Sequence, residues 1–184
     1  MAYLPSLIRA VQDALSDQRR QRVTESGVAE CCRTLVGKVL EWDTPDLVIA
    51  IATGGTSPGN LMAEAMGIPV VHLHISRDIK IKRRYSLDPI PLRWILSAYH
   101  HFLFQTTMPK VLSDTEIDVS GKKVLIVDDS VHTGKTIDVA VRYVEGKHAS
   151  EIKVATLARV SERCPDFFVL PPGNYSFPWS KDYV

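Results

Sequence analysis

The chain has 184 residues, about the size of one domain with a small appendage, and 45% of them are hydrophobic and 23% charged. Its 22 basic and 21 acidic residues leave a net charge of +1, which argues against a nonspecific nucleic-acid-binding protein, because such proteins carry a basic excess. The three cysteines do not form a disulfide framework or paired metal-ligand spacing, so we expect reduced, buried side chains. The most apolar window, residues 94–104, is too short to span a bilayer, and no signal-peptide pattern opens the chain. We therefore expect a cytoplasmic protein with no membrane or nucleic-acid partner.

Apolar patterning predicts two helices, followed by strands that alternate with helices. Residues 4–19 have apolar side chains at helical spacing, and a second helix is expected after Thr24, a suitable N-cap. Short continuous apolar runs are typical of strands covered on both faces, and they occur at residues 47–52, 70–75, 123–128 and 152–157, with a fifth strand expected at 167–170. Further helices are expected at residues 60–66, 92–105 and 135–145.

Strands that alternate with helices through short loops predict an α/β fold with a mainly parallel central sheet flanked by helices. We expect one domain over residues 1–184, with N-terminal helices in residues 1–42 and a C-terminal segment, residues 165–184, that supply a small hood. Ligands of such sheets bind beyond the carboxyl ends of the strands. The loops to consider are therefore those after Ala52, Ile75, Asp128 and Leu157.

Residues 124–136 carry the most informative pattern: an apolar run, the acids Asp128 and Asp129, a short loop and the start of a helix. Backbone N–H groups at a helix start, helped by the hydroxyls of Thr133 and Thr136, suit a phosphate dianion. Adjacent carboxylates ahead of that site suit the hydroxyl groups of a sugar, or Mg²⁺ held on those hydroxyls. The residues therefore indicate a site for a sugar phosphate with a metal.

Other interpretations explain less of this segment. A Walker A loop needs a glycine where this chain has Asp129. A phospho-receiver domain needs far more chain after its acidic strand than the about 55 residues that remain. Two surface acids before a capped helix would account for Thr133, but not for acids that directly follow a buried apolar run.

The segment resembles the phosphoribosyl-diphosphate binding motif of type I phosphoribosyltransferases, in which apolar residues, two acids, a short loop and a Thr-Gly-Gly/Lys-Thr ending follow one another. Residues 51–63 resemble the diphosphate loop and following helix of bacterial xanthine-guanine enzymes. Phe177-Pro178-Trp179 resembles the Pro-Trp pair near the C-terminus of purine-type members. The resemblance covers the chain from about Asp46 to its C-terminus and implies the type I phosphoribosyltransferase fold.

The resemblance implies a Mg²⁺-dependent pentosyltransferase of purine salvage. Such an enzyme transfers ribose 5-phosphate from phosphoribosyl diphosphate to a purine or purine-like oxo base, such as hypoxanthine, guanine or xanthine, and releases diphosphate. A homodimer is also implied. A noncatalytic module of the same fold, which senses phosphoribosyl diphosphate or a nucleotide, stays open as the alternative.

Roles for individual residues follow from the resemblance. Asp128 and Asp129 would hold the ribose hydroxyls and Mg²⁺. The diphosphate would meet the loop after the first strand, where the family often has a strained non-proline peptide bond. That loop consists of Thr53, Gly54 and Gly55, and the residues expected around the 5′-phosphate are Thr133, Gly134, Lys135 and Thr136.

Several positions depart from the purine enzymes. His132 stands where they usually have Asp, so it is a general base or donor toward the base, a sign of a different ring, or only a loop residue. Arg159 stands where they carry a Lys that contacts the exocyclic oxygen of the base, and its guanidinium would deliver two parallel donors. Thr53 replaces a common Arg or Lys, which removes one cation from the leaving group. The aromatic expected to stack on the base is Tyr175 or Phe177.

Two further segments are less specific. The five cations between Arg77 and Arg84 stand where the family has a mobile catalytic loop, so they would meet the diphosphate or form a solvated face. Residues 92–109 have no clear counterpart in the short purine enzymes. Their apolar face is expected to cover the site or to form a dimer contact.

Overall fold

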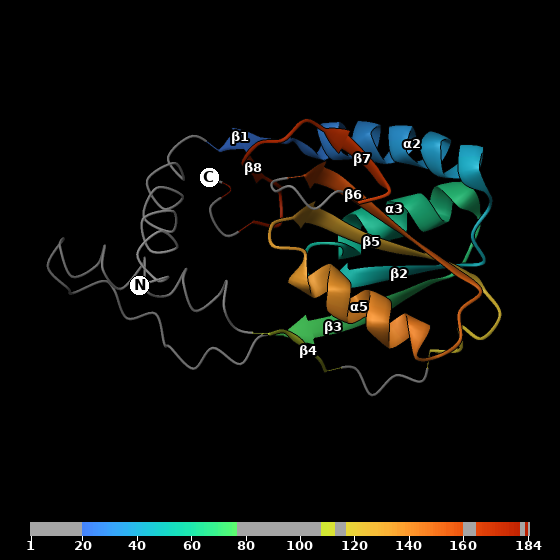
Figure 1. Cartoon of the computed structure of the whole chain (residues 1–184). Helices are drawn as coiled ribbons and strands as arrows, with labels where there is room; N and C mark the ends of the chain where they lie inside the picture. The colour runs from blue at the N-terminus through green and yellow to red at the C-terminus, as the bar shows by residue number, and fades with distance from the viewer. Residues whose placement is uncertain (1–19, 77–107, 113–116, 160–164, 181–182, 184) are drawn as a thin grey trace, which may run out of the picture. The chain divides into compact units, whose positions relative to one another are not determined.

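A computed structural model describes residues 20–76, 108–112, 117–159, 165–180 and 183 (Figure 1). Residues 20–76 and 110–184 belong to one compact unit, which is the part of the molecule considered below. The helices predicted at residues 4–19 and 92–105, the basic segment from Arg77 to Arg84, and Cys164 lie outside the described residues.

A six-stranded sheet in the order β4-β3-β2-β5-β6-β7 forms the centre of this unit. Five of its strands run parallel, and the edge strand β4 is antiparallel to β3. The bounds are β2 Leu47–Ala52, β3 Val70–Ser76, β4 Lys110–Val111, β5 Lys123–Val131, β6 Glu151–Arg159 and β7 Phe167–Leu170. The predicted α/β fold with a mainly parallel sheet is therefore confirmed.

Helices cover both faces of the sheet (Figure 1). α2 (Glu25–Trp42) and α3 (Thr56–Met66) pack on one face, and α5 (Lys135–Glu145) packs on the other. Because successive side chains of a strand point to opposite faces, β5 contributes to two cores. Leu125 and Val127 lie in the core with α2 and α3, whereas Val124 and Ile126 lie in the core with α5.

A separate pair of short strands joins the two ends of the described chain. β1 (Gln21–Arg22) pairs in parallel with β8 (Tyr175–Ser176), outside the central sheet. The pairing is extended by the N–H of Val23, which donates to the carbonyl of Ser176 at 3.0 Å. This ladder fixes where the C-terminal segment leaves the core.

α2 begins as the sequence predicts. The hydroxyl of Thr24 accepts a hydrogen bond from the N–H of Gly27 at 3.1 Å, so one of the otherwise unpaired donors of the first turn is satisfied. Cys31 and Cys32 are free thiols buried on the inner side of this helix. Burial, reinforced by the neighbouring Cys31, raises the pKa of the Cys32 thiol to about 12, as expected for an unreactive core side chain.

Two predicted boundaries are wrong by three residues or more. α3 begins at Thr56 rather than at residue 60, because the first turn of a helix tolerates Pro58, whose missing N–H has no partner there. The strand predicted to end at Asp128 continues to Val131. The acids therefore lie within β5, where backbone pairing to β6 holds them more firmly than a loop would.

Candidate functional site

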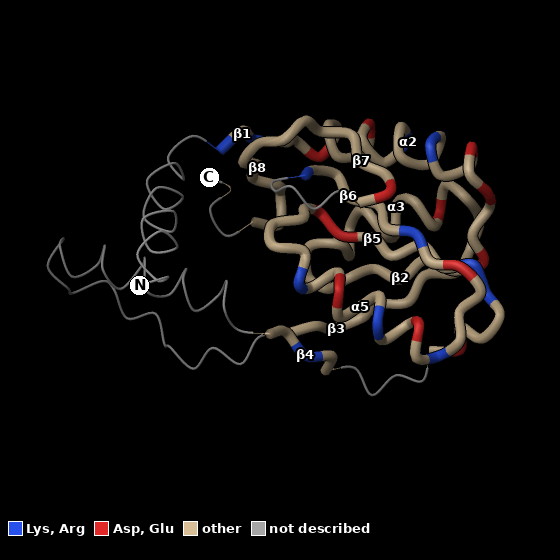
Figure 2. Tube along the Cα trace, viewed as in Figure 1, with Lys and Arg blue, Asp and Glu red and all other residues tan. Residues whose placement is uncertain are grey.

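The carboxyl ends of β2, β5 and β6 meet at one edge of the sheet, since these strands are parallel neighbours. The acidic segment of β5 lies near this edge in Figure 2. The edge brings together three of the segments that the sequence singles out: the loop after β2, the acid pair with its loop, and Arg159 at the end of β6.

Asp128 is almost fully enclosed, with 9% of its surface exposed. Its Oδ1 accepts a hydrogen bond from the N–H of Asp129 at 2.9 Å. Burial raises the pKa of the Asp128 carboxyl well above its usual value, the charge of Asp129 raises it further, and the N–H bond only partly offsets this. Asp128 is thus a carboxyl group that is poised to take up a proton when nothing cationic is bound beside it.

Asp129 is held from three sides. Its Oδ1 accepts a hydrogen bond from the hydroxyl of Ser130 at 3.1 Å, and its Oδ2 accepts one from the indole N–H of Trp179 at 2.8 Å. A Cβ atom added to Gly54 would lie only 2.5 Å from Oδ2. The backbone of the loop after β2 therefore packs directly against this carboxylate, and a side chain at residue 54 would force the carboxylate to shift.

The loop after β2 is built from close backbone contacts. The peptide bond between Ala52 and Thr53 is cis, at the place where the resemblance implies an unusual bond. A Cβ atom on Gly55 would lie 2.2 Å from the carbonyl oxygen of Val127, so glycine is needed for the loop to pass β5. Thr53 itself is exposed. The loop thus offers accessible backbone beside Asp129.

The loop between β5 and α5 consists of residues 132–134, and its side chains are accessible. His132 and Thr133 are exposed, and Gly134 adopts a left-handed φ of 75° as the N-cap of α5. This turn sets the start of an 11-residue helix at the edge of the sheet. Lys135 and Thr136, in its first turn, are half-buried. A helix start of this kind favours an anion, by its N–H groups and its dipole.

Arg159 ends β6 opposite Val131 of β5. The centre of its guanidinium group lies 5.2 Å from the centre of the Phe168 ring. Its Nε is buried, and it has no hydrogen-bond partner among the described residues. A buried donor without a partner is costly, so Arg159 stands out among the described residues at this edge of the sheet.

The C-terminal aromatic side chains form a continuous stack. The Phe177 and Trp179 rings are stacked, with centroids 5.3 Å apart, and Tyr175 is tilted against Phe177 at 6.4 Å. Phe177 is 2% exposed and belongs to the core. Tyr175 is half-buried, and its hydroxyl donates to the carbonyl of Pro171 at 2.9 Å. Of the two aromatics expected near a base, Tyr175 is therefore the more accessible one.

Comparison with known proteins identifies the family. A model of the phosphoribosyl transferase domain matches residues 23–166. The chain belongs to the phosphoribosyl transferase domain family. The match confirms the resemblance found in the sequence, and it includes the loop after β2, the acid pair and Arg159.

Purine phosphoribosyltransferases are among the proteins that this phosphoribosyl transferase domain resembles. The crystal structure of a purine phosphoribosyltransferase from Pyrococcus horikoshii superposes with a TM-score of 0.70 at 25% identity, over 90% of this chain and 97% of the other. The transcriptional regulator GfcR of Methanocella arvoryzae is 26% identical over 71% of this chain and 55% of its own length. A hypoxanthine-guanine phosphoribosyltransferase of Streptococcus pyogenes is 30% identical over 34% of this chain and 35% of its own length. The matches thus span about half or less of these curated relatives.

The described residues contain no group of three or more His, Cys, Asp or Glu side chains that could hold a metal ion. Mg²⁺ usually binds through one or two protein carboxylates, with the remaining oxygens from water and substrate phosphates. The adjacent carboxyl groups of Asp128 and Asp129 fit that kind of shared site. They would hold the cation only together with a substrate.

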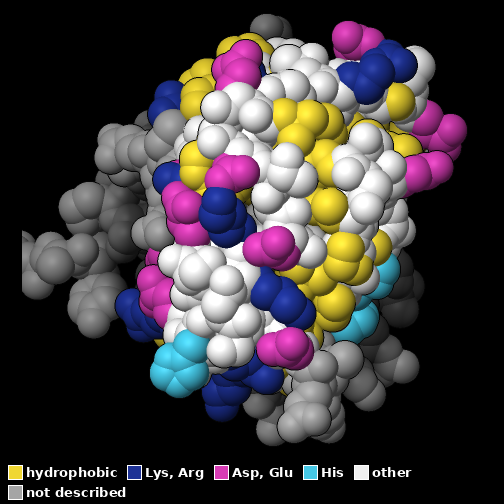
Figure 3. All heavy atoms as spheres, turned by 90° about the vertical axis from the view of Figure 1, so that its right-hand side faces the viewer, with side chains coloured by type: hydrophobic (Ala, Val, Ile, Leu, Met, Phe, Trp, Pro, Cys, Tyr) yellow, Lys and Arg dark blue, Asp and Glu magenta, His cyan; other side chains and the backbone are white. Residues whose placement is uncertain are grey.

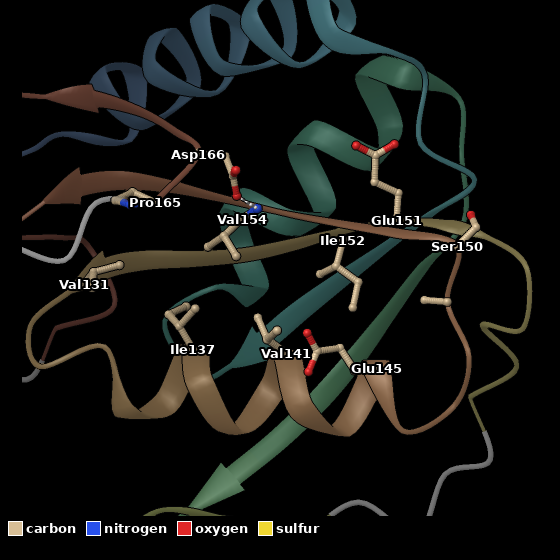
Figure 4. Close-up of a pocket in the computed structure, with 11 residues that line it drawn as sticks. Val131, Ile137, Val141, Glu145, Ser150, Glu151, Ile152, Val154, Pro165 and Asp166 are labelled. Carbon is tan, nitrogen blue, oxygen red and sulfur yellow. Dashed lines mark hydrogen bonds between the residues drawn. The ribbon is translucent and has the colours of Figure 1, made fainter.

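A groove of about 440 Å³ lies between α5 and β6, and it is distinct from this site (Figure 4). None of the predicted site residues lines it, although Val131 and Ile137, which do, flank residues 132–136 in the sequence. Its walls are largely aliphatic, with Glu145 and Asp166 among the acidic side chains at its margins. The predicted site is the accessible edge of the sheet rather than this groove.

The sequence alone does not assign a site role to Trp179. Trp179 was visible only as part of a Pro-Trp pair, which carries no role by itself. The structure brings it against Asp129 from 50 residues away. Phe168 likewise gains its contact with Arg159 only from the fold.

Proposed function

We propose that this protein is a Mg²⁺-dependent phosphoribosyltransferase that transfers ribose 5-phosphate from phosphoribosyl diphosphate to a purine or purine-like oxo base. The observation that carries the proposal is the contact between Gly54 and the Asp129 carboxylate. This contact brings the loop that we expect to bind the diphosphate next to the acids that we expect to bind the pentose. The family match and the purine enzymes among the relatives support the same reaction.

The protein's own groups would act by positioning the sugar. Asp128 and Asp129 accept hydrogen bonds from the ribose hydroxyls, and the start of α5 with Thr133 and Gly134 holds the 5′-phosphate. The side-chain-free backbone at Gly54 lets the diphosphate approach the acids. When bound, Mg²⁺ supplies charge neutralisation for the departing diphosphate. Fixed in this way, the anomeric carbon is presented to a base nitrogen without the entropy cost of a random encounter.

Arg159 is proposed to select the base. Its buried Nε lacks a hydrogen-bond partner among the residues that the structure describes, and the Phe168 ring lies beside the guanidinium group. A planar donor pair suits an exocyclic oxygen, so an oxo base fits better than an amino base. Tyr175 would stack on the ring of the base, and His132 would contribute a donor or acceptor at its edge.

The cellular setting is proposed from the sequence: purine salvage and the homodimer follow from the resemblance, and the cytoplasmic location from the composition. We place the protein in purine salvage, as a cytoplasmic homodimer. Among the described residues, no helix is long and apolar enough to cross a membrane.

A noncatalytic sensor of phosphoribosyl diphosphate or a nucleotide is the second candidate. One relative is a transcriptional regulator, and Thr53 leaves the diphosphate loop without the cation common in the bacterial enzymes. The same site geometry would then serve for binding without transfer.

Diphosphate release separates the two candidates. Purified protein is mixed with phosphoribosyl diphosphate, Mg²⁺ and one of hypoxanthine, guanine, xanthine, adenine or orotate. We expect release with the oxo purines that depends on Mg²⁺. If no base reacts but phosphoribosyl diphosphate raises the melting temperature, the sensor is correct. If no base reacts and calorimetry with Mg²⁺ detects no binding of phosphoribosyl diphosphate or of any ribonucleotide, both candidates are wrong.

A further inference from the structure

The hydrogen bond between Trp179 and Asp129 joins the end of the chain to the acid pair. The indole Nε1 donates to Oδ2 at 2.8 Å, and both groups are partly buried. A hydrogen bond to a carboxylate is stronger than one between neutral groups. It therefore restricts how the Asp129 carboxylate can rotate.

Trp179 is presented from a rigid support. Its ring lies 5.3 Å from that of Phe177 with only 7° between the ring planes, and Phe177 is fixed in the core. The turn that carries the indole is closed twice. The N–H of Phe177 donates to the hydroxyl of Ser180 at 3.1 Å, and the N–H of Ser180 donates to the carbonyl of Phe177 at 2.8 Å. The indole N–H is thus aimed before any ligand arrives.

The bonds already made by Asp129 leave room for a sugar. An ionised carboxylate has about four acceptor positions, two on each oxygen. Ser130 uses one on Oδ1 and Trp179 uses one on Oδ2. One position remains on each oxygen, which matches the two neighbouring hydroxyls of a pentose cis-diol. Trp179 is therefore compatible with a bound sugar and need not leave when the sugar binds.

We propose that Trp179 is a positioning residue, which orients the Asp129 carboxylate for the cis-diol of a pentose phosphate and thereby sets the affinity for that sugar. This inference rests on the proposed role of Asp129 in sugar binding. Because the Trp179 ring belongs to the same stack as Tyr175, the contact also ties the pentose end of the site to the aromatic expected beside the base.

Two substitutions separate the N–H group from the ring. Trp179→Phe keeps an aromatic ring over Phe177 but removes the donor, whereas Trp179→His restores a ring N–H. For Trp179→Phe we expect the Kd and KM for phosphoribosyl diphosphate with Mg²⁺ to rise about tenfold or more, the size expected for one lost hydrogen bond to a charged group. We expect kcat to change less than about threefold, because the bond serves binding. Trp179→His should recover part of the affinity.

Trp42 offers a matched control. Its indole N–H donates to Oε1 of Glu151 at 3.1 Å, at the amino end of β6 and away from the site. Trp42→Phe therefore loses the same kind of bond and should leave the Kd for phosphoribosyl diphosphate unchanged. A similar loss of affinity in both variants would show a general loss of stability and would overturn the proposal.

The indole resonance of Trp179 gives a readout independent of turnover. In a ¹H–¹⁵N spectrum it is assigned by its absence from Trp179→Phe, and it should move in Asp129→Asn and on addition of phosphoribosyl diphosphate with Mg²⁺. Unchanged or tighter binding by Trp179→Phe overturns the positioning role while the proposed function stands. If the wild-type protein does not bind phosphoribosyl diphosphate, the proposed function fails and this inference fails with it.

Discussion

The amino and carboxyl ends of the sheet differ in how their charged side chains are paired. At the amino end, Lys123 forms an ion pair with Asp43, and its N–H donates to Asp46 at 2.8 Å. Lys153 lies 3.4 Å from Asp166 in the same region. Figure 3 looks onto this end, where acidic and basic side chains are interspersed with hydrophobic ones. At the carboxyl end, burial raises the pKa of Asp128, and the Nε of Arg159 is buried without a hydrogen-bond partner among the described residues.

The difference agrees with the proposal that the carboxyl end of the sheet holds the ligand, whereas the paired charges of the amino end serve the fold. Paired surface charges contribute little each and cost little. A buried carboxyl group with a raised pKa and a buried donor without a partner both cost free energy, and such costs gather at functional sites. A bound sugar phosphate with an oxo base would satisfy both groups. Each prediction below substitutes a residue at the carboxyl end of the sheet and compares it with a control variant elsewhere.

The largest effect is expected from the acid pair. Replacing Asp128 and Asp129 together with Asn should lower turnover at least about a hundredfold, because both proposed acceptors of the ribose hydroxyls lose their charge. The fold should persist, since Asn fills the same volume. Diphosphate release measures turnover, and circular dichroism checks the fold. Asp43→Asn removes a carboxylate from the amino end and serves as the control; substantial activity in the double variant would contradict the assignment.

Arg159→Lys should have the next largest effect. Lysine keeps the charge but loses the planar donor pair and the stack on Phe168. We expect kcat/KM for hypoxanthine to fall about tenfold to a hundredfold, with a smaller change for adenine. Lys38→Met is the matched control, because Lys38 lies 5.9 Å from the centre of the same ring. Equal losses for oxo and amino bases would show that Arg159 does not read the oxygen.

The sequence predicts those parts of the fold that burial alone determines. The run at residues 47–52 matches β2 because a strand covered on both faces is apolar throughout. α5 has the predicted bounds because Gly134 marks its start. The predicted end of β5 was wrong because Asp128 and Ser130 pair with β6 through their backbone, and their polar side chains give no apolar signal.

The site is predictable only in outline. That the loops after β2 and β5 share one edge follows from parallel topology. The contact of Gly54 with Asp129 depends on how the two strands are aligned, and the sequence does not state this. The bond from Trp179 depends on a turn held by Ser180 and on a core ring, Phe177, so no local pattern reveals it.

The pH dependence of stability should differ in sign between the two ends. Asp128 has a raised pKa in the folded state, so its protonated form is favoured there and stability falls as pH rises from about 4 through the raised value. A side-chain hydrogen bond from Lys123 lowers the pKa of Asp43, so its contribution is present above about pH 4 and is lost as pH falls through the lowered value. These two groups therefore oppose each other across the acidic range.

Urea unfolding between about pH 2 and pH 8 tests this, because the Asp43 contribution changes below about pH 4 and the Asp128 contribution changes above it. Asp128→Asn should be more stable than the wild type at pH 7 and should lose less stability as pH rises. Asp43→Asn should be slightly less stable at pH 7 and should flatten the acid side of the profile. A destabilised Asp128→Asn variant at pH 7 would show that the Asp128 carboxyl is satisfied in the free protein.

The smallest effect is expected at His132, which is exposed in the loop after β5. His132→Asp restores the residue usual in purine enzymes, so kcat/KM for hypoxanthine should improve a few-fold if this side chain faces the base. The added negative charge also lies near the expected 5′-phosphate, so the base must be varied at saturating phosphoribosyl diphosphate. His148→Asp, an exposed site at the other end of α5, makes the same change of charge far from the base. If only the KM for phosphoribosyl diphosphate rises, His132 is a loop residue, and selection of the base rests with Arg159 and Tyr175.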